Sequence, residues 1–268
     1  MKNKLTLLLV GLLAASPALA VDYDGGNLVV EHTFPASKRT TLTYVRPAGT
    51  AVDYSNVTTF LGQTVLNGGA ANQAGNTITR MTMDDLTPTG TNAGQDVLQF
   101  KFSVVNLNTV PLTFRPRARF WNADGAGGNP GTYYSVPAAV GFTFNPVVVG
   151  ANAATVFTAN LAANQFKMPG STFWAGLTFD NNGGGTGATA AQLDNLGQGL
   201  FDPADVGASQ DTYFHTTAAG SFFGTANPAG AQGNFMGAPV ANMGWEFTAD
   251  VVVGVEDTNW TTIKALFK

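Results

Sequence analysis

Four segments of the chain alternate strictly between apolar and polar residues, and this pattern constrains the fold more than any other feature. In one of them Phe100 and Phe102 fall on one face, while Lys101 falls on the other. Successive side chains of a strand point to opposite faces, so each segment predicts an antiparallel strand with one buried and one solvent-facing side. The four segments are 97–105, 112–121, 172–179 and 245–253.

Weaker strand candidates are separated by clusters of Gly, Pro and Asn that are typical of turns. Helical signal is confined to 188–196 and to the tail from residue 259. So many short strands with almost no helix predict an all-β fold, an antiparallel β-sandwich with jelly-roll-like connections. The weaker candidates are 27–34, 40–46, 57–66, 76–83, 132–144, 154–161 and 210–215.

The strand pattern gives no sign of a second domain, so residues 21–255 are predicted to form one β-sandwich. The stretch from Asp180 to Gly244 is rich in Gly, Ala and Asn, and it is interpreted as a long insertion on the sandwich. Pro116 predicts that its strand lies at a sheet edge or is bulged there, because proline cannot donate to a ladder. Residues 256–268 are predicted to form a short amphipathic tail.

The first 20 residues have the three parts of a secretory signal peptide. Lys2 and Lys4 precede an apolar run that ends at Leu13, and Ala18 and Ala20 are the small residues that a signal peptidase reads. Cleavage after Ala20 is expected, which predicts a secreted, extracellular or cell-surface protein. No later segment reaches the roughly twenty apolar residues of a transmembrane helix, so a protein integral to the membrane is not expected.

Charge and cysteine content exclude several classes of function. The chain has 13 Lys and Arg against 17 Asp and Glu, and loss of Lys2 and Lys4 with the signal peptide changes the net charge from −4 to 11 − 17 = −6. Nucleic-acid binding needs a basic surface, so nucleic acid is not an expected partner. The absence of cysteine removes thiol catalysis and thiolate-bound metals.

Residues for catalysis are scarce. His32 and His215 are the only histidines, and His32 is expected to have a structural role on its strand. A glycosidase needs two carboxylates that face each other across the scissile bond, and the spacing of the glutamates suggests no such pair. We therefore expect a protein without enzymatic activity and keep a glycan-active enzyme as an alternative.

Two loops carry oxygen side chains of the kind that calcium prefers. Asn122 and Asp124 precede a glycine-rich stretch that also contains Asn129, while Asp180 and Asn182 begin a second glycine-rich stretch. Calcium binding is one interpretation of both loops. A turn closed by Asn and Asp side chains is the other.

Aromatic side chains near loops are the usual platforms for sugar rings, and Trp174, Tyr133 and Tyr134 are the candidates here. Trp174 alternates away from the apolar face of its strand. Packing in the core or between sheets is the alternative interpretation for all three.

An arginine stripe on the 112–121 strand is expected to pair with carboxylates of a neighbouring strand or to face water. Binding of an acidic polymer is the less favoured interpretation of this stripe. This stripe consists of Arg115, Arg117 and Arg119.

Segments 114–131, 173–180 and 244–247 together resemble the secreted β-sandwich proteins of environmental bacteria that often carry a PEP-CTERM sorting tail. This resemblance covers roughly residues 95–253 and implies export, surface or matrix association, and no established catalytic activity. The chain departs from that group because it has no Pro-Glu-Pro motif, no terminal transmembrane helix and no closing basic cluster.

These observations favour a non-enzymatic structural or adhesive protein of the cell surface or extracellular matrix. The alternative is a calcium-assisted carbohydrate-binding module that contacts an extracellular polysaccharide through residues 122–129 and 180–182.

Overall fold

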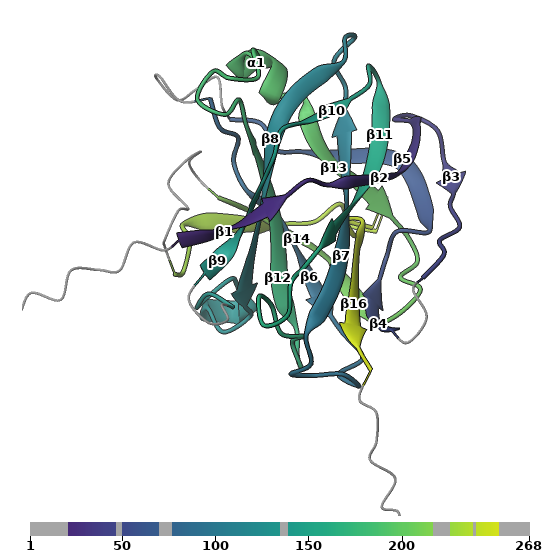
Figure 1. The fold of residues 1–268 in the computed structure, drawn as a ribbon, viewed down its shortest axis with the longest axis vertical. Coiled ribbons are helices and arrows are strands. Elements are labelled where there is room, and N and C mark those ends of the chain that lie inside the picture. The colour runs from purple at the N-terminus through teal and green to yellow at the C-terminus, as the bar shows by residue number, and fades with distance from the viewer. Residues whose placement is uncertain are drawn as a thin grey trace, which may run out of the picture.

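The computed structural model describes residues 21–46, 50–69, 77–134, 139–216, 226–237 and 240–251. Two large sheets pack against each other, and the regular elements are almost all strands (Figure 1). The predicted all-β sandwich is confirmed. The expected signal peptide and the 256–268 tail lie outside the described residues.

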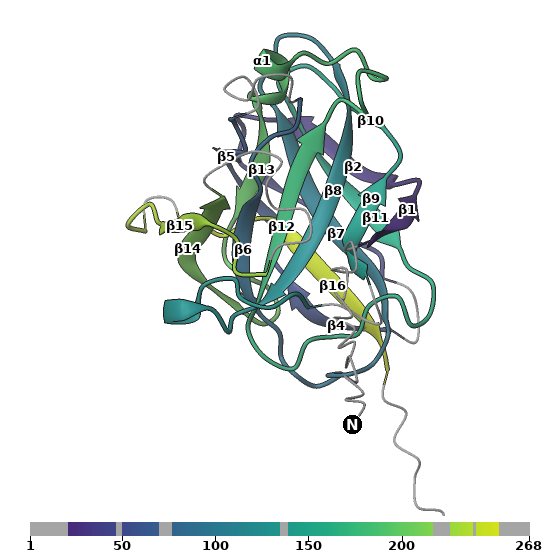
Figure 2. The ribbon, with the colours of Figure 1, turned by 90° about the vertical axis from the view of Figure 1, so that its left-hand side faces the viewer.

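Sheet A contains eight strands, and its neighbours are antiparallel except for β1, which runs parallel to β9. The ribbon of β14 and β15 lies at one side of the molecule and β1 at the other (Figure 2). In spatial order the strands are β1 (Val21–Gly26), β9 (Ala139–Phe144), β8 (Leu112–Asn122), β12 (Phe173–Asp180), β6 (Thr82–Thr87), β14 (Ala208–Thr216) and β15 (Gly230–Gly233), and β10 (Val147–Val149) also pairs with β8.

Sheet B also contains eight strands. Its main path is β2 (Val29–Pro35), β11 (Ala153–Asn160), β7 (Val97–Asn106), β13 (Leu196–Phe201), β5 (Thr59–Leu66) and β3 (Thr40–Thr41). Off this path, β16 (Trp245–Asp250) pairs with both β7 and β4 (Thr50–Ser55). Within the described residues the helical elements are η1 (Ala126–Gly128) and α1 (Ala190–Leu193), and α1 begins after the capping residue Thr189.

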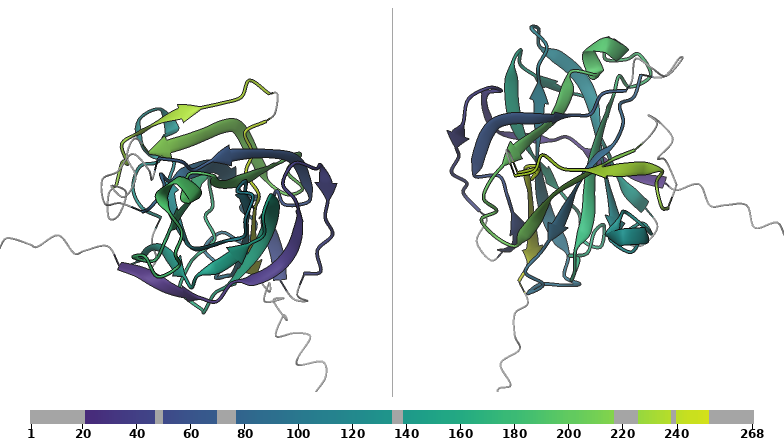
Figure 3. Two further views of the ribbon diagram at one scale, coloured as in Figure 1. Left: turned by 90° about the horizontal axis from the view of Figure 1, so that it is seen from above. Right: turned by 180° about the vertical axis from the view of Figure 1, so that it is seen from behind.

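The main core lies between the two sheets and is rich in phenylalanine. Seen from above, strands of both sheets surround it (Figure 3). Phe100 on β7 is fully buried and stacks on Phe247 of the same sheet, while its ring meets Phe120 of sheet A edge-on at 5.6 Å. The apolar faces that the sequence predicts for β7, β8, β12 and β16 all contribute to this core.

Both sheets also bury part of their outer faces, which the alternation did not predict. Phe34, Phe60 and Phe201 belong to a second apolar cluster on sheet B, and a third cluster lies on sheet A. The polar side of β7 was expected to face solvent, yet Lys101 is only 2% exposed and Ser103 only 1%. The alternation therefore identified the strands correctly, but it predicted solvent exposure for a face that other parts of the chain cover.

The stretch between Asp180 and Gly244 is not an insertion on the sandwich. It supplies β13 to the middle of sheet B, between β7 and β5, and it supplies β14 and β15 to sheet A. Strand β13 has glycine at two of its six positions and does not alternate between apolar and polar residues, so the strand escaped prediction.

Pro116 lies where β8 changes partners on one side. Strand β10 pairs with residues up to Phe114, and β9 pairs from Arg117 onward. The proline thus occupies a local edge inside a central strand, where no ladder bond is needed, in agreement with the prediction from its sequence position.

Candidate functional site

The outer face of sheet A carries a charged half and an aromatic half. Strands β8 and β12 pair so that Arg115 lies opposite Asp180 and Trp121 lies opposite Trp174. Between these ends Arg119 lies opposite Gly176, so the arginines and the tryptophans share one face of the sheet.

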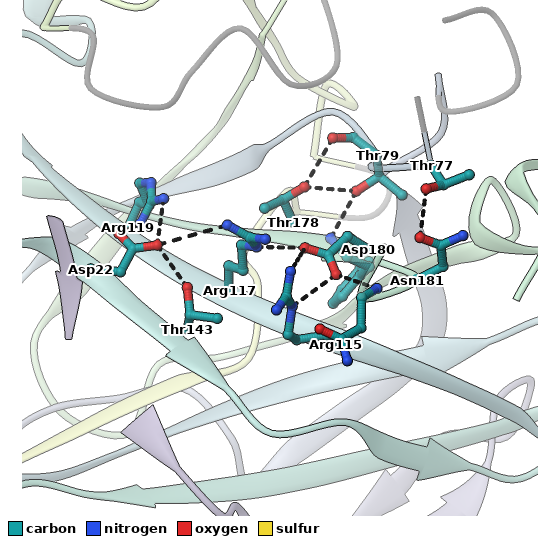
Figure 4. A network of polar contacts seen from close by, with 12 residues as sticks. Asp22, Thr77, Thr79, Arg115, Arg117, Arg119, Thr143, Thr178, Asp180 and Asn181 are labelled. Atoms are coloured by element: carbon teal, nitrogen blue, oxygen red, sulfur yellow. Dashed lines mark hydrogen bonds and ion pairs between the residues drawn. The ribbon is translucent and has the colours of Figure 1, made fainter. Parts of the chain in front are cut away.

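The charged half is a closed network of ion pairs (Figure 4). The Arg115 guanidinium holds both Asp180 oxygens, at 2.9 and 3.1 Å, and Arg117 donates to the same carboxylate. Arg119 donates to both oxygens of Asp22 on β1. The expectation that this arginine stripe pairs with carboxylates of neighbouring strands is confirmed.

Asp180, one of the predicted calcium ligands, is therefore engaged by two guanidinium groups. Its Oδ1 also accepts a hydrogen bond from the backbone N–H of Asn182 at 2.7 Å, and the Asn182 side chain is exposed. These contacts neutralise the charge that a calcium ion would require at this carboxylate.

The predicted 122–129 loop closes on itself. Asp124 accepts hydrogen bonds from the N–H and the hydroxyl of Thr132, at 2.7 and 2.6 Å, and Asn122 donates to the same hydroxyl. These bonds hold the pKa of Asp124 below its usual range. Asn129 lies in the same loop, and its Oδ1 is buried with no hydrogen-bond partner among the described residues.

Calcium binding stays a prediction for both loops. Among the residues that the structure describes, no three His, Cys, Asp or Glu side chains lie together as a metal site would need.

The three predicted aromatic residues are packed. Trp174 is 2% exposed, and its Nε1 donates to the carbonyl of Gly128 at 2.8 Å, so the η1 loop lies against this indole. Tyr133 stacks on Trp121 at 5.3 Å. Tyr134 instead packs against Phe166, whose ring it meets edge-on at 5.6 Å. The outer face thus brings Trp174 and Tyr133 into one apolar cluster, while Tyr134 packs against the main core.

A cleft of about 330 Å³ opens beside Trp174. Its one charged lining residue is Asp85 on β6, which lies opposite Trp174 in the ladder. Asp85 Oδ1 accepts a hydrogen bond from the N–H of Gln210 at 3.2 Å. We call this the Asp85 cleft; its lining residues are Asp85, Ala123, Gly127, Gly128, Thr172, Trp174, Gln210, Thr212 and Gln232.

Burial raises the pKa of Asp85 to about 6. Its neighbour Asp84 is fully buried and accepts hydrogen bonds from the N–H of Met243 and the hydroxyl of Ser209. Burial, with the charge of Asp85 as a smaller cause, raises the pKa of Asp84 as well. Only Asp85 lines the cleft, so these two carboxylates do not face each other across it.

Sequence reasoning missed Asp85. The predicted strand 76–83 ends just before it, and its hydrogen-bond partner Gln210 is 125 residues away. Two adjacent aspartates in a run of buried residues would have been the only clue.

His32, for which a structural role is expected, is half-buried on sheet B. Its ring meets Tyr44 edge-on at 4.9 Å, and its Nε2 lies 3.1 Å from the Thr43 carbonyl oxygen.

Comparison of the chain with protein-family models, with curated proteins and with solved structures finds no match. No helix in the described part of the chain is long and apolar enough to cross a membrane.

Proposed function

We propose that this protein is an exported, non-catalytic β-sandwich that binds an uncharged sugar of an extracellular polysaccharide in the Asp85 cleft. The observation that carries the proposal is the composition of this cleft. A single buried carboxylate is surrounded by amide and hydroxyl side chains beside an indole.

This lining matches the chemistry of a sugar. A carboxylate accepts hydrogen bonds from ring hydroxyls, and the amides of Gln210 and Gln232 both donate and accept. The hydroxyls of Thr172 and Thr212 add small polar contacts, and the buried Trp174 forms part of the cleft wall.

The size and charge of the cleft restrict the kind of sugar that it can bind. A volume of about 330 Å³ lies at the lower end of the roughly 300–1,000 Å³ of ligand clefts, so one or two sugar rings fit better than a long segment. Asp85 is the only charged residue in the lining, so an anionic sugar would be repelled at neutral pH.

Hydrolysis is not part of the proposal. A glycosidase needs two carboxylates across the bond that breaks. Asp84 and Asp85 lie 3.1 and 3.4 Å from the same Ser209 hydroxyl, and only Asp85 lines the cleft. Calcium is not needed either, since the η1 loop wall at Gly127 and Gly128 is held by the contacts of Asp124 with Thr132 and of Trp174 with Gly128.

The test is native gel electrophoresis of the protein through gels that contain one soluble neutral polysaccharide at a time. We expect retention by at least one polymer, and we expect Asp85→Ala to weaken it about tenfold, because hydrogen bonds to a charged group contribute roughly 1.5–3 kcal/mol. Asp205→Ala is the matched control, since it removes the same charge from an exposed position.

Equal retention of Asp85→Ala and the unchanged protein would refute the proposal. Each gel is repeated with calcium and with a chelator. Retention that requires calcium would instead support binding by the 122–129 and 180–182 loops.

A further inference from the structure

A second cleft, of about 340 Å³, lies on the other side of the β14–β15 ribbon. Tyr213 and His215 line it, and they alternate along β14 with Phe214, which packs in the outer apolar cluster of sheet A. The two rings lie 4.8 Å apart. We call this the Arg80 cleft; its lining residues are Arg80, Tyr213, His215, Thr216, Ala231, Gln232 and Gly233.

The Arg80 cleft is positively charged. Arg80 is its one charged lining residue, and none of these residues is acidic. Within the described residues no carboxylate forms an ion pair with Arg80, whereas Arg115, Arg117 and Arg119 are all paired. A guanidinium that lines a cleft without a carboxylate partner is suited to receive an anion from outside.

Backbone at the edge of the cleft makes room for this guanidinium. Gly69 has a φ of +93°, and a Cβ atom there would lie 2.7 Å from Arg80 Nε. A side chain at position 69 would therefore displace Arg80 or strain the backbone.

His215 provides an independent observation. Its Nε2 is buried with no hydrogen-bond partner in the described part of the chain. Burial, with the charge of Arg80 as a smaller cause, lowers the pKa of His215 to about 4, so the ring is neutral at neutral pH. An unsatisfied buried nitrogen is costly and calls for an explanation, and a ligand group is one.

We infer that the Arg80 cleft binds the carboxylate of an acidic sugar, with the Arg80 guanidinium on the two carboxylate oxygens and Tyr213 and His215 beside it. A planar carboxylate matches the two parallel N–H donors of arginine better than a single point charge does. Tyr213 offers a hydroxyl that donates, and the neutral ring of His215 offers one donor and one acceptor.

The sugar part of this inference rests on the proposed function. Gln232 lines both the Arg80 cleft and the Asp85 cleft, so the two clefts adjoin at the ribbon. A polysaccharide that passes over the β14–β15 ribbon at Gln232 can place an uncharged ring beside Asp85 and a uronic acid further along the chain beside Arg80. The ligand class is therefore a polysaccharide that contains both neutral sugars and uronic acids.

Nuclear magnetic resonance of the imidazole groups tests the inference directly, because the chain has only two histidines. The protein is titrated with a uronic acid oligomer, with a neutral oligomer of the same length, with acetate and with sulfate. We expect the uronic acid oligomer to shift the His215 signals, to leave those of His32 in place and to raise the pKa of His215.

Arg80→Gln is expected to weaken binding of the uronic acid oligomer about tenfold or more, as loss of a bidentate charged contact does. Arg39→Gln is the matched control on an exposed arginine just before β3, and it should bind as the unchanged protein does. The signals of His215 also report whether the Arg80→Gln variant is folded.

Unchanged affinity in Arg80→Gln, or no shift of His215 with the uronic acid oligomer, would overturn the inference. Binding of acetate or sulfate as tight as that of the oligomer would overturn its sugar part. These outcomes are separate from the Asp85→Ala test: retention by a neutral polysaccharide that is lost in Asp85→Ala supports the proposed function whether or not uronic acid binds.

Discussion

Replacing Glu246 by glutamine is expected to lower the free energy of unfolding by about 3–5 kcal/mol, the cost of removing one partner from a buried ion pair. Glu246 is fully buried, and its Oε1 accepts a hydrogen bond from Lys101 Nζ at 2.6 Å. Its Oε2 accepts from Arg46 and from Ser55, both at 2.8 Å. Glutamine keeps the shape of the side chain but leaves the buried Lys101 ammonium without the carboxylate that it contacts.

Urea unfolding at neutral pH measures this change, and two variants isolate its cause. Lys167→Met removes an ion pair with Asp96 whose side chains are 29% and 21% exposed, and it should cost no more than about 1 kcal/mol. The double variant Lys101→Met/Glu246→Leu should recover most of the loss, because Arg46 is 38% exposed and can reach water. A loss in Glu246→Gln no larger than in Lys167→Met would show that the buried charge pair is not what holds these strands.

This ion pair also shows the limit of the strand pattern. Lys101 and Glu246 occupy the polar positions of β7 and β16, and alternation alone assigns such positions to solvent. They are buried because sheet B is covered on its outer side, where the ring of Tyr44 lies 4.5 Å from Lys101 Nζ. Which chain segment covers an outer face depends on the tertiary path, and a period of two carries no information about that path.

Strands whose sequence alternates between apolar and polar residues could be predicted, even where both faces are buried as in β12, and strands without alternation could not. Strand β12 was found through Phe173, Leu177 and Phe179, and its orientation correctly placed Trp174 on the outer face. Strand β13 was missed because its sequence, Leu-Gly-Gln-Gly-Leu-Phe, has no regular alternation. Asp85 was missed because the strand predicted over 76–83 ends before it.

The candidate site was accessible to sequence reasoning only in part. The arginine stripe and its need for carboxylate partners followed from the spacing of Arg115, Arg117 and Arg119. The partner Asp22 could not be deduced, because β1 joins sheet A through a parallel pairing with β9. A cleft is set by the register of strands far apart in sequence, and no local pattern encodes that register.

Asp85→Asn is expected to be more stable than the unchanged protein, and the difference in the free energy of unfolding should grow as the pH rises from 4 to 7.5. The pKa of Asp85 is raised from 3.8 to about 6 by burial, so the folded state holds a proton that the unfolded state has lost between these values. The stabilising contribution of this group is therefore complete below pH 3.8 and is lost as the pH rises through about 6. Asparagine resembles the protonated form and avoids that loss, which is of the order of 1–3 kcal/mol.

Comparing the two proteins at each pH cancels the titrating groups that do not interact with Asp85. Asp84 does interact with it, and loss of the Asp85 charge lowers the pKa of Asp84, which changes the difference in the same direction. His215, whose pKa is lowered to about 4, has the opposite pH dependence and is present in both. Asp96→Asn provides a control of opposite sign, because the hydrogen bond from Lys167 lowers the pKa of Asp96. Its carboxylate stabilises the fold above pH 3.8, and this contribution is lost as the pH falls through the lowered pKa.

Urea unfolding of the three proteins across this pH range measures the free energy of unfolding at each pH and tests the prediction. A difference between Asp85→Asn and the unchanged protein that does not vary with pH would mean that Asp85 is as well solvated as an ordinary surface aspartate. The burial argument for the Asp85 cleft would then fail. If the difference grows as expected, the fold keeps a carboxylate charged at neutral pH at a cost in stability. A binding site explains such a cost, since the charge that destabilises the empty cleft is the charge that accepts the hydroxyl groups of a sugar.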